Sequence, residues 1–372
     1  MKYFSIPADF INDTIDKYNE LNNIYEDSKL IETYGQLTDF GEFNKIGSGR
    51  SLRILPQVDM KELEKYVKYS LDKKIKFNYT LNSSCMGNNE LSKSGMNQLY
   101  NFLKELSNIG VTSLTVAMPS VIELINTFGF DFKIKTSAIC QVSSANKALF
   151  YKKLGVERVV IDEDISRKFD SIKEISSVFG DGVEVIVNSL CMKNCAYKMF
   201  HYNHESHNHE EISNKASGYY YNRCIYQISK DIRNPLKLNW IRPEDLKHYT
   251  NIGVNYFKIQ GRQSVHKGNP VETLKCYFEE NYNGNLIDLF TLFRKDNNYE
   301  SNLPYIDNKS LNGFLEPFLN KNFCKENCSS CDYCLKYAEK AINIAQAEDL
   351  NRQIQEHHKI SDSYINMLKE VY

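Results

Sequence analysis

Four cysteines near the carboxyl end of the chain are the residues best suited to chemistry. They stand close together in the run Cys324-Lys-Glu-Asn-Cys328-Ser-Ser-Cys331-Asp-Tyr-Cys334. Thiolates are soft ligands for zinc and iron, so this density indicates a metal site. Zinc sites usually combine two cysteine pairs from separate turns, whereas close successive spacings are typical of iron–sulfur ligation. We expect an iron–sulfur cluster here, with zinc as the alternative.

The first three of these cysteines have the C-x3-C-x2-C spacing that radical S-adenosylmethionine enzymes use. In those enzymes the motif follows an early strand of a barrel. Here it follows all the strands that the sequence predicts, so an auxiliary or electron-relay cluster fits this position better.

A second group of cysteines lies in the middle of the chain. Cys191 follows the end of an expected strand at 183–188, and Cys195 comes after it in C-x3-C spacing. Cys224 arrives after a loop that carries histidines. Barrel enzymes place their chemistry at the carboxyl ends of the strands, so we expect these thiols to hold a metal centre.

A compact thiolate site needs a fourth ligand, and two cysteines compete for that role. Cys85 follows the expected strand at 74–80, and Cys140 follows the one at 132–138. We expect Cys85 to be the ligand and keep Cys140 as the alternative. Either thiol could instead be a small buried core residue. Cys276 lies inside an apparent helix, where we expect it to be part of the core.

Histidines crowd the segment after Cys195, at His201, His204, His207 and His209. Imidazole binds metals and exchanges protons near neutral pH. The zinc-protease pattern HExxH is missing from the sequence. Two interpretations stay open: a solvated loop, or one histidine, His201, that acts at the site.

Two basic residues flank the end of the last expected strand. Lys258 lies in the apolar run Tyr-Phe-Lys-Ile, and Arg262 follows it. One interpretation is an ion pair inside the barrel, since an unpaired buried ammonium is costly. The other is an anion clamp, because arginine can grip a carboxylate or phosphate with two hydrogen bonds. Arg50, in Gly-Ser-Gly-Arg, could serve similarly.

Short strand-like runs alternate with amphipathic segments and must position these residues. The sequence predicts strands at Lys2–Ile6, Ser51–Leu55, Lys74–Thr80, Thr112–Ala117, Phe132–Ala138, Arg158–Asp162, Val183–Asn188 and Tyr256–Gln260. Apolar residues at helical spacing predict helices at Met60–Leu71, Leu91–Asn108, Ala145–Leu154 and Ile165–Phe179.

Three helix-to-strand junctions carry the same Gly-Val signal, at 110–111, 155–156 and 253–254. Glycine suits a left-handed helix end, and the valine begins a buried strand. Repeated units of this kind predict parallel strands, and about eight of them predict an α/β fold, a (β/α)8 TIM-like barrel. An open doubly wound sheet is the alternative. We place the barrel at residues 1–262 and a helical, cysteine-rich extension at 263–372.

The overall composition is that of a soluble globular protein, with 42% hydrophobic and 25% charged residues and a net charge of −1. This balance gives no electrostatic footprint for nucleic acid, without excluding such a partner. The sequence has neither a secretory leader nor a long apolar run, so we expect no membrane association and a cytoplasmic location. In that reducing compartment the ten cysteines are expected to be metal ligands rather than disulfides.

Several segments resemble peptidase family U32. They are the run 187–201 around Cys191 and Cys195, the run Trp-Ile-Arg-Pro-Glu-Asp-Leu at 240–246, and the Leu-Gly-Val-Glu-Arg-Val-Val run at 154–160. The strand ending in Lys-Ile-Gln-Gly-Arg at 258–262 is similar to the family's Lys-Ile-Glu-Gly-Arg, with Gln260 in place of the acid. The resemblance covers roughly residues 75–265.

This resemblance implies a TIM-like barrel with a four-cysteine [4Fe–4S] cluster, as in several members. The matching cysteines are Cys191, Cys195 and Cys224, with Cys85 as the fourth. Members with known roles hydroxylate a quinone precursor or RNA cytidines without oxygen, and older members carry a protease label. We therefore expect an iron–sulfur redox enzyme that modifies an anionic small molecule, a peptide or RNA, with a protein partner or electron donor. The alternatives are a peptidase and a non-catalytic iron–sulfur subunit.

Overall fold

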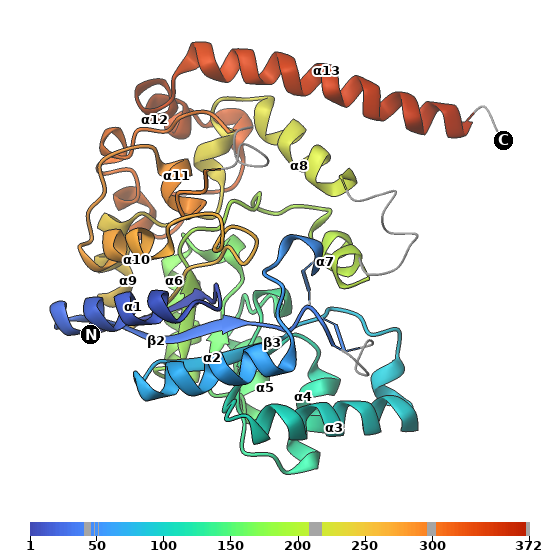
Figure 1. Ribbon diagram of the computed structural model, residues 1–372. Coiled ribbons are helices and arrows are strands. Elements are labelled where there is room, and N and C mark those ends of the chain that lie inside the picture. The colour runs from blue at the N-terminus through green and yellow to red at the C-terminus, as the bar shows by residue number, and fades with distance from the viewer. Residues whose placement is uncertain (41–45, 48, 51, 208–217, 296–302, 370–372) are drawn as a thin grey trace.

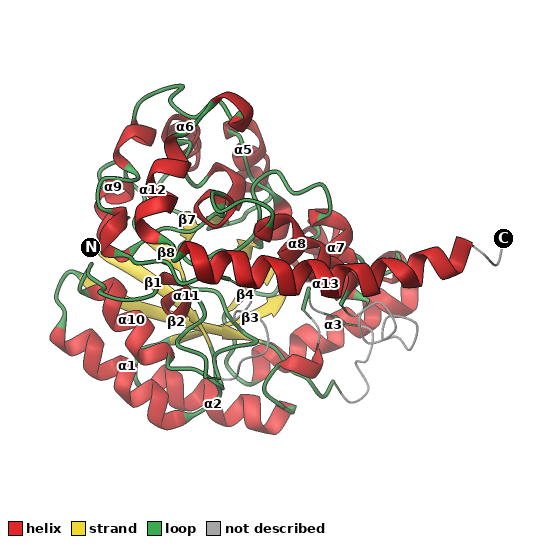
Figure 2. Cartoon of the chain, turned by 90° about the horizontal axis from the view of Figure 1, so that it is seen from above, coloured by secondary structure: helices red, strands yellow, loops and turns green. Residues whose placement is uncertain are grey.

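The protein forms an eight-stranded parallel barrel. The computed structural model describes residues 1–40, 46, 47, 49, 50, 52–207, 218–295 and 303–369. The strands lie in the order β5-β4-β3-β2-β1-β8-β7-β6, and the pairings between these strands are parallel. Parallel bridges between Lys135 and Arg158, and between Val142 and Ile161, bring the two edges together. Seen from above, the strands lie in the middle and helices surround them (Figure 2). The expected (β/α)8 fold is confirmed.

The strands occupy short segments spread over the first 258 residues. They are β1 (Lys2–Pro7), β2 (Ser28–Gly35), β3 (Lys76–Leu81), β4 (Ser113–Val116), β5 (Lys133–Thr136), β6 (Val159–Val160), β7 (Val183–Ile186) and β8 (Tyr256–Lys258).

Helices connect these strands and form the extension (Figure 1). They are α1 (Asn12–Ile24), α2 (Met60–Asp72), α3 (Lys93–Asn108), α4 (Pro119–Phe128), α5 (Ala145–Lys153), α6 (Phe169–Phe179), α7 (Lys198–Ser206), α8 (Tyr219–Ser229), α9 (Leu246–Thr250), α10 (Pro270–Phe278), α11 (Leu286–Phe290), α12 (Tyr333–Ala341) and α13 (Ile344–Lys369).

One predicted strand is wrong and one observed strand was missed. Leu52–Ile54, within the expected strand Ser51–Leu55, form a 3-10 helix, and the second barrel strand is instead β2. The strand β2 was missed because it contains Glu32, and a charged residue argues against a buried strand. Lys135 and Arg158, more than 100 residues further along the chain, neutralise this glutamate. The other expected strands each overlap an observed one.

The predicted helices and their glycine ends are confirmed. α2 begins with a capping box, in which Asp59 accepts a hydrogen bond from the Glu62 backbone and Glu62 accepts one from Asp59. Gly110, Gly155 and Gly253 have φ values of 94°, 80° and 85°, so each takes the left-handed conformation that the Gly-Val signal predicted.

Charged side chains fill the barrel interior below its mouth. Lys135 on β5 contacts Glu32 on β2 and lies 3.1 Å from Glu184 on β7. Arg158 lies 3.1 Å from Glu32. Burial alone would raise the pKa of Glu184, but the charges of Lys135 and Arg158 outweigh burial and lower it to about 2. The barrel centre is therefore braced by ion pairs.

The extension shares the core of the barrel. Trp240 stacks on Phe290 of α11 and lies 5.7 Å from Phe314, measured between ring centroids. Arg242 pairs with Asp245 at 2.9 Å and donates to the backbone oxygen of Asn308. The 240–246 run is therefore a joint between barrel and extension.

The last helix, α13, reaches beyond the rest of the molecule (Figure 1). It packs against α8, where His358 stacks on Tyr226 with ring centroids 3.7 Å apart. None of the helices in the described ranges has the length and apolarity needed to cross a bilayer.

Candidate functional site

A small cavity at the barrel mouth gathers basic side chains. It measures about 60 Å³, and its walls include Arg50, Lys258 and Arg262 together with Tyr34 from the end of β2. Lys258 is the last residue of β8, so strand geometry places its side chain at the carboxyl-terminal face of the barrel. The structure therefore brings together the basic residues that the sequence singled out.

Lys258 and Arg262 are both buried, and their charges are perturbed. Burial, with repulsion from Lys135, lowers the pKa of Lys258 to about 7. Burial and the charge of Arg50 lower the pKa of Arg262 to about 10. Arg262 donates a hydrogen bond to Gln36, whereas Lys258 lies over the ring of Tyr34 at 4.1 Å. A ligand anion in this cavity would relieve the repulsion between the cations.

Glu163 is a member of this cavity that the sequence analysis missed. It follows β6, is 6% exposed, and its Oε2 has no hydrogen-bond partner within the described parts of the chain. Burial raises its pKa, which favours the protonated form. The sequence signal that could have identified Glu163 was its position just after a strand end. Gln260, also in the wall, bonds to the backbone of Asn188.

A larger cavity next to the barrel mouth is lined by the central cysteines. It measures about 320 Å³ and includes Cys191, Cys195, Cys224 and His201. Cys224 comes from α8, and His201 comes from α7. Burial raises the pKa of Cys224 to about 12, with Cys195 nearby adding to the effect. The three central cysteines thus line one cavity, and their role as metal ligands stays a prediction.

The two cavities share a wall. Tyr202 on α7 lines both the small cavity with the basic residues, here called the cation cavity, and the larger cavity with the central cysteines, here called the thiol cavity. Glu163 lies close enough to Cys191 for its charge to help burial raise the pKa of that thiol. The thiols and the cations are therefore neighbours across Tyr202 and Glu163.

The fourth ligand is not identified by the shape of the thiol cavity. Neither Cys85 nor Cys140 is among the described residues that line it. Cys140 donates to the backbone oxygen of Ala117 at 3.2 Å and is buried, which suits a core residue. Cys85 lies in a loop tied to α7, where Ser84 bonds to Asn203 and Ser206. The assignment of Cys85 stays a prediction.

His201 lies at the thiol cavity and not at the barrel mouth. Its ring stacks on Tyr220 with centroids 5.4 Å apart, and its Nε2 lies 3.6 Å from Glu205. His209, the last of the histidine run, falls outside the described residues. A catalytic role for His201 is untested.

The tail cysteines form a second thiol group beside the first. Cys324, Cys328 and Cys334 line a cavity of about 180 Å³, and Cys331 is exposed. The segment from Met192 to Asn194 lines this cavity and also the cavity of the central cysteines. One short segment thus separates the two cysteine groups.

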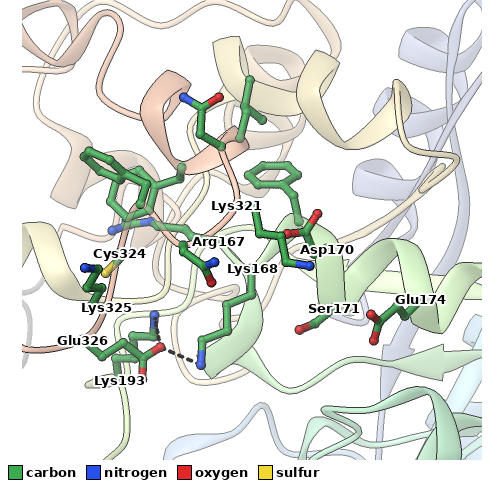
Figure 3. A pocket seen from close by; sticks show the side chains of 16 residues that line it. Arg167, Lys168, Asp170, Ser171, Glu174, Lys193, Lys321, Cys324, Lys325 and Glu326 are labelled. Atoms are coloured by element: carbon green, nitrogen blue, oxygen red, sulfur yellow. Dashed lines mark ion pairs between the residues drawn. The ribbon is translucent and has the colours of Figure 1, made fainter.

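Glu326 ties the tail cysteine segment to the barrel. Its carboxylate lies 2.6 Å from Lys168 and 2.9 Å from Lys193, and it accepts a hydrogen bond from Asn194. Figure 3 shows the carboxylate between the two lysines at the edge of a polar pocket, which Glu174 and Lys321 also line. Burial would raise its pKa, but these partners lower it to about 2. No local sequence signal predicted this contact.

The thiols are not arranged around a single ion. Within the described ranges, no three cysteine, histidine or acidic side chains converge on a position for one metal ion. A zinc ion needs four ligands within about 2.3 Å of one point. An iron–sulfur cluster distributes its ligands over several irons. The three central thiols line one cavity of about 320 Å³.

The protein is a parallel barrel with basic residues at its mouth and a group of thiols beside it. The model of peptidase family U32 matches residues 47–282. A Methanocaldococcus jannaschii protein called an uncharacterized protease is 31% identical over 332 residues, which cover 88% of this chain and 94% of that protein. The chain belongs to peptidase family U32.

Solved structures give more distant similarities. A U32 peptidase structure has a TM-score of 0.49 and 16% identity, and covers 69% of this chain and 91% of its own. A Thermobaculum terrenum O-GlcNAc hydrolase mutant has a TM-score of 0.33 and 10% identity, with 48% and 44% covered. Both are too distant to bear on function.

Proposed function

We propose that this protein is an iron–sulfur redox enzyme whose substrate is a small anion bound at the barrel mouth. One observation carries the proposal. Tyr202 lines both the thiol cavity and the cation cavity, with Glu163 beside it, so a redox group and a substrate would be neighbours. Such proximity suits electron transfer between them without a long path.

The central thiols would hold the first metal centre. Cys191, Cys195 and Cys224 supply three ligands, and Cys85 is the proposed fourth, with Cys140 as its alternative. When bound, a [4Fe–4S] cluster supplies one-electron transfer. Burial raises the pKa of the Cys191 and Cys224 thiols, so loading would release protons and would be favoured by higher pH. His201 borders the same space and is a proposed acid–base group there.

The tail thiols would hold a second centre that relays electrons. Cys324, Cys328, Cys331 and Cys334 are its proposed ligands, for an iron–sulfur cluster with zinc as the alternative. The shared segment from Met192 to Asn194 supports a relay, because it leaves little protein between the two groups. Electrons would come from a partner protein that donates them singly, in a reducing cytoplasm.

The cations at the barrel mouth would bind the substrate. Arg262 and Arg50 suit a carboxylate or phosphate, and Lys258 adds a third basic group. From the resemblance noted in the sequence, the proposed reaction is hydroxylation without dioxygen, on a small molecule, a peptide or RNA.

Electron paramagnetic resonance tests the proposed arrangement. Dithionite-reduced protein, purified without air, should give cluster signals of which Cys191→Ser removes the barrel component and leaves the tail component. Cys276→Ala should keep both, because Cys276 lies in the core on α10. Inorganic phosphate should alter the barrel component in the wild type and not in Arg262→Met. A barrel component insensitive to phosphate, or a spectrum unchanged by Cys191→Ser, would contradict the proposal.

A peptidase is the second candidate, favoured by the names of the family and of the Methanocaldococcus relative. Cleavage of denatured casein by metal-free protein, lost in a barrel-mouth variant such as Lys258→Met, would support it. Intact casein after prolonged incubation would count against it.

A further inference from the structure

The buried lysines of the described residues differ in their partners. Lys135 is 2% exposed and pairs with Glu32 and Glu184. Lys198 is 8% exposed and lies 3.0 Å from Asp162 and 2.9 Å from Asp164. Each therefore has two carboxylates, as a buried ammonium requires.

Lys258 lacks such a carboxylate. It is 7% exposed, and its side chain has neither a hydrogen bond nor an ion pair among the residues that the structure describes. Its ammonium group lies over the Tyr34 ring, at 4.1 Å from the centroid. The groups that face it are Lys135, Arg262, Glu184, Glu32 and Tyr34.

The balance of these neighbours favours the neutral amine. Lys135 and Arg262 repel a charge on Lys258, and the attraction of Glu184 and Glu32 is already shared by Lys135 and Arg158. A neutral amine carries a lone pair and is a nucleophile toward carbonyl carbon. A lysine made nucleophilic by burial and a neighbouring cation is a known route to imine chemistry.

The cavity gives this amine an accessible reaction space. Lys258 lines the 60 Å³ cavity together with Arg50 and Arg262. The Nε atom of Arg50 is buried there without a hydrogen-bond partner among the described residues. Two guanidinium groups beside an amine suit a ligand with an anionic group next to a carbonyl.

We propose that Lys258 forms an imine with a small carbonyl compound whose carboxylate or phosphate is held by Arg50 and Arg262. The lysine nitrogen attacks the carbonyl carbon, the resulting carbinolamine loses water, and a carbon–nitrogen double bond remains. Hydrolysis reverses both steps and releases the compound. This proposal rests on the anion site proposed above and needs no metal centre.

Reductive trapping tests the imine directly. The probe is glyoxylate, the smallest anionic aldehyde, with sodium cyanoborohydride at pH 7, followed by peptide mass spectrometry. Lys258 should gain a carboxymethyl group faster than exposed Lys61 by roughly tenfold or more, because an ordinary lysine with a pKa of about 10.4 is almost wholly protonated at that pH. Buried Lys135 is the internal control and should remain unmodified.

Three further measurements distinguish the possible causes of labelling at Lys258. Inorganic phosphate and the Arg262→Met substitution should each slow labelling of Lys258, with Lys61 unaffected. Propionaldehyde, which has no charge, should label Lys258 several-fold more slowly than glyoxylate. Equal labelling by the two aldehydes would overturn the anionic substrate class, and an unmodified Lys258 would overturn the imine. Iron analysis of the same sample tests the redox proposal separately.

Discussion

The side-chain amide of Asn194 donates a hydrogen bond of 2.9 Å to the carboxylate of Glu326. Asn194 lies between two central cysteines, Cys191 and Cys195, and Glu326 lies between two tail cysteines. One hydrogen bond therefore joins the two thiol groups, which are more than 100 residues apart in the sequence.

Replacing Glu326 should loosen the tail cysteine segment. Glu326→Gln removes the charge that pairs with Lys168 and Lys193, so residues 320–332 should exchange their amide hydrogens faster. The barrel should exchange as before. Glu174→Gln is the matched control, because Glu174 lines the same polar pocket and is exposed. Equal exchange in the two variants would refute a role for Glu326 as an anchor.

Serine at Cys328 and Cys334 should disturb the tail and spare the barrel. Metal binding supplies folding free energy to residues 320–332, which are exposed in the structure, so its loss should make this segment more sensitive to proteases. Limited proteolysis with mass spectrometry measures this, and elemental analysis should show less iron or zinc. Unchanged metal content would show that these thiols are not ligands.

The barrel ion pairs make Lys135 a structural residue. Lys135→Met leaves Glu32 and Glu184 buried without their shared counter-charge, and should reduce the free energy of unfolding by about 3–5 kcal/mol. Lys133→Met, on the same strand, removes an exposed pair with Glu157 and should leave the free energy of unfolding nearly unchanged. Urea denaturation measures both. A smaller loss for Lys135→Met than for Lys133→Met would contradict this.

Lys258 should have the opposite effect on stability. Its pKa is about 7 when folded and about 10.4 when unfolded, so the unfolded chain binds the extra proton between these values. Stability should therefore rise with pH across that window. Lys258→Met should be more stable than the wild type at pH 6, by roughly 1–3 kcal/mol, and the gain should shrink towards pH 10. Thermal melts across this pH range check it; a gain independent of pH would show that the pKa of Lys258 is the same in the folded and unfolded chain, which would contradict the prediction.

The sequence was informative where local patterns determine structure. Helical spacing and the Gly-Val signal predicted the helices and the barrel. The strand ends before Cys191 and at Lys258 indicated where these residues lie, whereas metal ligation by Cys191, Cys195 and Cys224 stays a prediction. It failed where a residue depends on distant partners. Glu32 concealed β2 because its cations lie far along the chain, and the contacts of Glu326 depend on how the extension folds back. The wall that Tyr202 and Glu163 form between the two cavities was missed for the same reason, because it depends on how distant segments fold together.

Elemental analysis of protein purified without air tests the central claim most directly. Two [4Fe–4S] clusters predict about eight irons and eight sulfides per chain. Cys224→Ser should remove about four of each and leave the tail centre loaded, whereas Cys276→Ala should remove none. Four irons with one zinc would keep the barrel cluster and change only the tail metal. A wild-type protein that holds zinc alone, or no metal, would contradict the account.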